Sequence, residues 1–267
     1  METKIELRQL ALDIVLASDL TQKVKMASTI GQSQQLDANR DFACQLDQPG
    51  RADLPRLVAP ALVQRRNMAT AEGRAIMVHA LAHIEMNAIN LAADIMWRFP
   101  GMPERFYNDW ARVCREEAYH FGLLQQHLEG LGYRYGDFAA HDSLWEMAFK
   151  TRHDLLARLA LVPRTMEARG LDASPGLIAK MKQVQDLQIV GILEIIFRDE
   201  ITHVAIGNFW FNYLCQQQDL SPIETYRQLA QQYRAPVLRG PFNLPARKLA
   251  GFSDEELQSL QELAASR

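Results

Sequence analysis

The pattern Glu-x-x-His occurs twice in this chain, and each copy directly follows another acidic residue. The two copies read Glu116-Glu117-Ala118-Tyr119-His120 and Asp199-Glu200-Ile201-Thr202-His203. Residues three apart share one face of an α-helix, so each copy places a carboxylate beside an imidazole. With only seven histidines in the chain, chance predicts fewer than one such pair. The repeated pattern therefore predicts two helices whose polar pairs face a common interior.

A further glutamate precedes each copy by almost the same distance. Glu85 lies 32 residues before Glu117, and Glu167 lies 33 residues before Glu200. This interval is about the length of one helical hairpin. Four glutamates and two histidines projecting into a four-helix bundle are the ligands of dinuclear carboxylate metal sites. We therefore predict a metal site formed by Glu85, Glu117, His120, Glu167, Glu200 and His203.

The surroundings of Glu85 support its assignment as a ligand. Its neighbours at three, four and seven positions along a helix are all apolar: Val78, Leu81, Ala82, Ala88, Ile89 and Ala92. A carboxylate on such a face points into the core, where it is costly unless it is paired or bound to a metal. A buried salt bridge or a protonated carboxyl group is the alternative interpretation.

Glu167 has a less apolar neighbourhood, and it is kept because the two intervals match. Glu146 is a rival in the same region, although Ser143-x-x-Glu146 is a capping box that explains this glutamate without a metal. Glu194 is a second rival. It lies only six residues before Glu200, so it comes from the same helix and cannot supply a separate corner of the site.

Other polar residues near the motifs are expected to support the ligands. Glu116 and Asp199 would each accept the free ring N–H of a ligand histidine, and Glu194 would act similarly or as an adjustable extra ligand. His79 and His83 are spaced like ligands, but no third ligand accompanies them, so we expect a supporting polar role. The pattern identifies no catalytic residue.

Helical periodicity extends over most of the chain, which predicts an all-α protein. We expect a helix or helical pair at 4–30, an extended proline-containing arm at 37–66, and a long connection after about residue 130 that allows one crossover in a four-helix bundle. Residues 1–69 would then be an N-terminal helical and extended arm, 70–216 the bundle, and 217–267 a helical tail. The expected core helices are 70–99, 104–130, one from 143 past 161 with a bend at Pro163, a helix or continuation reaching 184 after a break at 171–176, and one ending near 215.

Composition excludes several classes of function. About half of the 267 residues are hydrophobic, and the net charge of −3 predicts no strong attraction to nucleic acid or anionic membranes. Three separated cysteines form no disulfide framework, zinc ribbon or iron–sulfur motif. The first residues lack the features of a signal peptide and no apolar run is long enough to span a bilayer. A cytoplasmic location is therefore expected.

Four stretches of the chain resemble a known family. They are 79–85, 115–120, 161–172 and 198–207, and they are similar to the uncharacterised ferritin-like family called domain of unknown function 455. The segment Met166-Glu167-Ala168-Arg169 also resembles a context in tRNA-modifying di-iron hydroxylases, where the glutamate is a ligand. The resemblance implies a ferritin-like fold and metal site, and it supports Glu167 over its rivals. It implies no substrate.

The predicted ligands suit two divalent ions, iron first, with manganese or a mixed pair as alternatives. We expect an oxidase or hydroxylase that activates oxygen or peroxide, with an unidentified small-molecule or macromolecular substrate and an electron donor. The alternative is an iron-handling or peroxide-consuming protein without an organic substrate. A homodimer is compatible with the sequence.

Overall fold

A computed structural model describes residues 5–64 and 67–265 of the chain, so residues 4, 65 and 66 of the predicted N-terminal segments lie outside the described residues. The all-α class is confirmed. Within the described ranges the elements are helices, and extended pairing is limited to two isolated bridges. The chain divides into two compact units, residues 1–149 and 150–267. The predicted three-part division stays a prediction.

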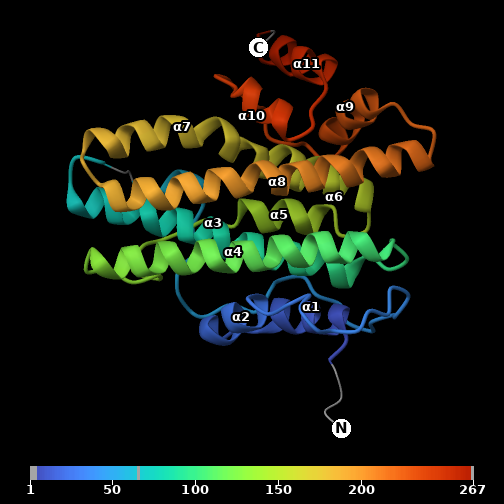
Figure 1. Ribbon diagram of the computed structural model, residues 1–267, viewed down its shortest axis with the longest axis horizontal. Coiled ribbons are helices and arrows are strands. Elements are labelled where there is room, and N and C mark those ends of the chain that lie inside the picture. Colours follow the sequence, from blue (N-terminus) through green and yellow to red (C-terminus); the bar gives the residue numbers. More distant parts are fainter. Residues whose placement is uncertain (1–4, 65–66, 266–267) are drawn as a thin grey trace. The chain divides into compact units, whose positions relative to one another are not determined.

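A long helical hairpin dominates the first unit (Figure 1). Its helices α3 (Ala71–Arg98) and α4 (Glu104–Gly130) match the predicted limits within one residue. Thr70 caps α3 through a hydrogen bond from the Gly73 N–H, at 3.0 Å. Gly101 adopts a φ of 77° in the turn between the two helices, where a residue without Cβ is favoured. The predicted helical pair is also present, as α1 (Leu7–Leu16) and α2 (Leu20–Ala27).

The proline-containing arm belongs to the first unit and is extended in its described residues, with one short helical turn, η1 (Pro60–Leu62). Arg8 of α1 is buried and links this arm to α3. Its guanidinium donates to the carbonyls of Met96 and Trp97, at 3.0 and 2.7 Å, and to that of Ala38 at 3.1 Å. Carbonyls in the last turn of a helix lack partners within the helix. Arg8 therefore caps α3 and holds the arm with one side chain.

The predicted single helix from residue 143 past 161 is wrong, because the chain breaks it in the middle. Helix α5 (Ser143–Lys150) ends before α6 (Leu155–Leu161) begins. Asp154 starts the new helix as its N-cap, since its carboxylate accepts the Ala157 N–H at 2.9 Å. Short polar side chains favour such caps over helix interiors. Pro163, where the sequence predicts a bend, lies in a π-helical turn, η2 (Val162–Glu167).

In its described residues, 150–265, the second unit contains α6, η2 and five further helices. In Figure 1, α7 (Ala168–Gln183) runs along α8, and the three short C-terminal helices follow. An apolar cluster that includes Ala168, Val204 and Phe252 joins α7 and α8 to the tail. The other helices of this unit are α8 (Leu187–Gln217), α9 (Pro222–Gln232), α10 (Leu244–Leu249) and α11 (Asp254–Ala265).

The predicted break at residues 171–176 is also wrong, since α7 continues through Pro175. Proline has no N–H, so the carbonyl of Leu171, four residues earlier, loses its donor in the helix. The side-chain amide of Asn243 replaces that donor at 3.1 Å. Asn243 also receives support from α7, because its own N–H donates to Asp172 Oδ1 at 2.9 Å. A tertiary contact therefore keeps the helix intact.

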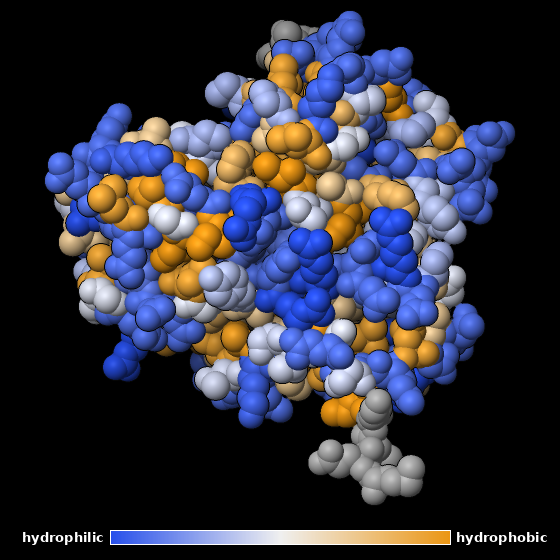
Figure 2. Space-filling model, in the orientation of Figure 1, coloured by the Kyte–Doolittle hydropathy of each residue, from blue (hydrophilic) through white to orange (hydrophobic). Residues whose placement is uncertain are grey.

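Figure 2 shows hydrophilic side chains over most of the drawn face, with apolar side chains in smaller patches between them. Among residues 5–64 and 67–265, no helix combines the length and apolarity that a bilayer crossing requires.

Candidate metal centre

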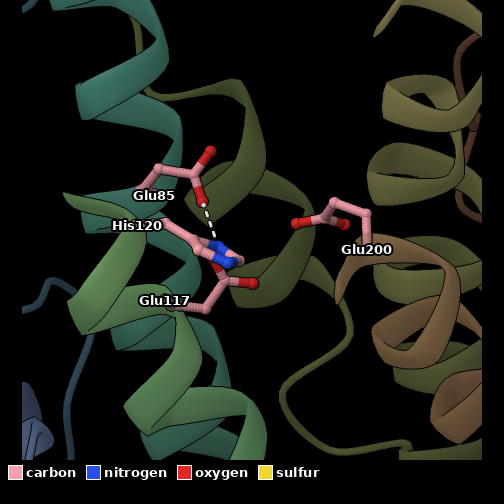
Figure 3. A group of neighbouring side chains, drawn as sticks. All are labelled: Glu85, Glu117, His120 and Glu200. Atoms are coloured by element: carbon pink, nitrogen blue, oxygen red, sulfur yellow. Dashed lines mark ion pairs between the residues drawn. The ribbon is translucent and has the colours of Figure 1, made fainter. Parts of the chain in front are cut away.

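Three predicted ligands meet inside the first unit. Glu85 comes from α3, and Glu117 and His120 come from α4. His120 Nδ1 lies 3.4 Å from Glu85 Oε2 and 3.5 Å from Glu117 Oε2. The three residues are 4%, 1% and 0% exposed. The α3–α4 hairpin thus brings two carboxylates and one imidazole together in the buried interior, and Figure 3 shows the pair of Glu85 and His120 as a dashed line.

The charges in this cluster favour a bound cation. Burial and the adjacent Glu117 raise the pKa of Glu85 well above its ordinary value. Burial alone lowers the pKa of His120, but hydrogen bonds and charges from Glu117 and Glu85 outweigh it and raise that pKa to about 11. Without a metal, protons must therefore supply the positive charge that two buried carboxylates need.

The donor atoms in this cluster fit a divalent metal. Carboxylate oxygen and imidazole nitrogen are suitable ligands for iron and manganese at two plus. Glu85, Glu117 and His120 each offer one such atom, and the group could hold a metal ion. A metal would take over the role of the bound protons, since metal ligands act in their deprotonated forms.

The second copy of the motif lies on α8 in the second unit. His203 Nδ1 is 3.5 Å from Glu200 Oε1, and the His203 side chain is fully buried while that of Glu200 is 13% exposed. Glu200 is also labelled in Figure 3. The local arrangement repeats that of Glu117 and His120, because both pairs have the same three-residue spacing along a helix. The predicted carboxylate–imidazole pair is therefore present in each unit.

Glu167 is the last residue of η2 and is half-buried. Within this turn, the Thr165 hydroxyl donates to the Ala160 carbonyl, five residues earlier, at 2.8 Å. Single π-helical turns inside α-helices are frequent at functional sites. In the sequence, Pro163 predicts a bend but not this π-helical turn, although the proline is the one local signal for it.

The packing of η2 is tight on the side of α8. A Cβ added to Gly207 would lie 2.6 Å from Pro163 Cβ and 2.7 Å from Pro163 Cγ. Contacts this short require the glycine, so the proline ring fits directly against the α8 backbone. The position of the turn that carries Glu167 is thus fixed by Gly207.

The predicted supporting acids each form an ion pair with a basic side chain. Glu116 accepts a hydrogen bond from Arg112 Nε at 2.9 Å, and Asp199 accepts one from Arg198 Nε at 2.9 Å. Glu194 is exposed and pairs with Lys182 at 3.0 Å. Each of the three acids therefore already has an arginine or lysine side chain as its partner. A role for them toward His120 or His203 stays a prediction.

His79 and His83 anchor the loop that follows α4. His79 Nε2 accepts the Gly136 N–H at 2.9 Å, and the two rings of His79 and Tyr135 stack with centroids 5.2 Å apart. His83 Nδ1 lies 2.8 Å from the Tyr135 hydroxyl. Burial lowers the pKa of both histidines to about 4. Their metal-like spacing therefore has a structural explanation.

Glu146, the rival for Glu167, is exposed on α5.

Comparison with known proteins identifies relatives but no activity. The profile of a family described as "Protein of unknown function (DUF455)" matches residues 16–258. A protein of Haemophilus influenzae (strain ATCC 51907 / DSM 11121 / KW20 / Rd), named "Uncharacterized protein", is 49% identical over 216 residues, which cover 78% of this chain and 75% of that protein. No solved structure matches.

Proposed function

The chain belongs to the DUF455 family, and we propose that it is a ferritin-like protein whose two Glu-x-x-His motifs hold two divalent metal ions. The observation that carries this proposal is the buried cluster of Glu85, Glu117 and His120, with Nδ1–Oε2 separations of 3.4 and 3.5 Å. Two carboxylates are rarely buried around one imidazole without a compensating cation.

The matching intervals in the sequence extend the proposal to the second unit. Glu167, Glu200 and His203 repeat the spacing of the first set within one residue. We propose that each set supplies one imidazole and two carboxylates. Four carboxylates would then balance the four positive charges of two divalent ions.

The proposed reaction class is oxidation of a substrate with dioxygen or peroxide. When bound, iron or manganese supplies the redox chemistry for such a reaction. The chain itself supplies a buried position for the metal: Glu85, Glu117 and His120 would hold it, and the imidazole of His120 would bind in its unprotonated form. Metal affinity should therefore increase with pH. The preference for iron over manganese belongs to the proposal too.

Metal content of purified protein tests the proposal directly. We expect about two iron or manganese ions per chain after anaerobic reconstitution and removal of loosely bound metal. A Glu117→Ala/Glu200→Ala variant should lose most of this metal. A matched control, Glu129→Ala/Glu224→Ala, removes one exposed carboxylate from each unit and should retain it. Metal-poor wild-type protein, or equal metal in both variants, would contradict the proposal.

Substrate oxidation and iron handling can be separated by the size of the assembly and the fate of iron. An oxidase should retain a fixed amount of iron, whereas an iron-handling protein should oxidise added ferrous iron in large excess over its sites. An iron store that assembles as a cage needs a compact bundle. We favour the oxidase, because this chain adds an N-terminal arm and C-terminal helices to its long hairpin.

A further inference from the structure

A cavity of about 520 Å³ lies among the C-terminal helices of the second unit, apart from the proposed metal ligands. Its apolar walls include Tyr226 and Ala230 of α9, Val237 of the following segment and Leu260 of α11. Small-molecule sites are largely apolar and typically occupy about 300–1,000 Å³. Val237 is 49% exposed here, so a ligand would remove apolar surface from water. The cavity therefore has the size and lining of a ligand site.

A buried arginine lines this cavity with an unused donor. Arg164 is 3% exposed; its Nη1 donates to Asn208 Oδ1 at 3.0 Å, and its Nη2 pairs with Glu256. Its Nε has no hydrogen-bond partner. A buried donor without a partner is destabilising. Arg164 therefore contributes to the cavity wall with a charge that Glu256 already pairs.

A second arginine gives the cavity an uncompensated positive charge. Arg227 is exposed on α9, and its Nη2 donates to Ser259 Oγ at 2.8 Å. Within the described part of the second unit, no carboxylate forms an ion pair with it. The other two arginines of the lining differ, because Arg164 pairs with Glu256, and Arg247 pairs with Asp172 at 2.7 Å. The local charge thus selects for one negative group.

We infer that this cavity binds a small organic monoanion with an apolar body, such as a medium-chain carboxylate. The apolar walls hold the body of the ligand, while Arg227 at the rim pairs with the anionic group. None of the proposed metal ligands lines the cavity, so evidence against the metal site would not count against ligand binding here. In Figure 2, apolar side chains are visible among hydrophilic ones in the region of the C-terminal helices.

Binding of 8-anilinonaphthalene-1-sulfonate, a fluorescent apolar monoanion, tests the inference on the full metal-replete chain. We expect saturable binding that decanoate displaces, while decanol displaces it less well and decyltrimethylammonium does not. Arg227→Gln should weaken the binding of both anions about tenfold, the effect of losing one charged contact. The matched control Arg239→Gln removes an exposed arginine outside the lining and should change the affinity less than twofold.

A second pair of variants tests the location of binding. Ala230→Trp fills the cavity and should abolish saturable binding, whereas Gln228→Trp places the same ring on an exposed position of α9 and should leave binding intact. Circular dichroism and thermal melting establish that each variant is folded. Absence of saturable binding, equal displacement by the cation, or retained binding in folded Ala230→Trp overturns the inference. Light scattering that shows a dimer lost only in Ala230→Trp would also overturn it, since a second copy would then occupy the cavity.

Discussion

Acid should destabilise the protein in part through His79, which holds the loop after α4. Its Nε2 accepts the backbone N–H of Gly136 at 2.9 Å, and therefore this nitrogen must be unprotonated in the folded state. Burial lowers the pKa of His79 from 6.5 to about 4. The unfolded chain consequently binds a proton more readily between these two values. Stability from His79 is fully present above pH 6.5 and is lost as the pH falls toward 4.

The size of this effect follows from the pKa difference. One pKa unit corresponds to about 1.4 kcal/mol, so His79 should contribute about 2 kcal/mol to the loss of stability between pH 7.5 and pH 5. His79→Gln provides the comparison, because glutamine can still accept the Gly136 N–H but does not titrate. Urea unfolding followed by circular dichroism at both pH values gives the difference between the two proteins, and groups common to both cancel.

The variant should lose about 2 kcal/mol less than the wild type over this pH range. His153→Gln serves as a control, since His153 is exposed and its replacement should leave the acid loss of the wild type unchanged. Equal acid losses in wild type and His79→Gln would refute the reasoning. That result would mean that the folded protein binds a proton at His79 as readily as the unfolded chain does, so that neither burial nor the Gly136 contact lowers the pKa of this histidine.

Two further predictions concern the second unit. Gly207→Ala should destabilise the protein by about 1–3 kcal/mol, because its Cβ would approach the rigid Pro163 ring to 2.6 Å. Gly191→Ala, at a helix position with open space, should instead stabilise it. Thermal melting of both variants gives the comparison. Asp172→Asn should lower the free energy of unfolding by about 3–5 kcal/mol, since Arg247 is 1% exposed and would keep its charge without its partner. Urea unfolding measures this loss, and a value below about 1 kcal/mol would contradict the importance of the Asp172–Arg247 ion pair.

Regular features of the sequence predicted the parts of the fold that depend on local pattern. The limits of α3 follow from apolar periodicity between Thr70, which caps it, and the turn at Gly101, which also separates it from α4. The same periodicity placed Glu85 in the core, and the three-residue spacing placed His120 beside Glu117. These relations are set within one helix or one hairpin, so the sequence contains them directly.

Features that depend on distant partners were predicted less well. The break between α5 and α6 needed Asp154 to act as a cap rather than as a surface residue. The roles of His79 and His83 were underestimated, because their partners, Gly136 and Tyr135, are more than fifty residues away. Nothing in the local pattern distinguishes a histidine that anchors a loop from one that binds a metal. Long-range hydrogen bonds decided these cases.

The uninterrupted course of α7 illustrates this dependence and can be tested as a coupling. Asn243 has two roles, since its Nδ2 donates to the Leu171 carbonyl at 3.1 Å and its Oδ1 accepts the Ala246 N–H at 3.3 Å. Asn243→Ala should therefore cost about 2 kcal/mol, roughly half from each role. In a Pro175→Ala background the new N–H at position 175 can bond the Leu171 carbonyl within the helix.

The cost of Asn243→Ala should then fall to about 1 kcal/mol, because only the cap on α10 is lost. A double-mutant cycle by urea unfolding measures the difference between the two backgrounds. Pro175→Ala alone should raise stability, as proline is the least favourable residue inside a helix. If Asn243→Ala costs the same in both backgrounds, the Leu171 carbonyl is not the reason that α7 passes through Pro175, and the continuity of the helix must instead come from its packing against α8.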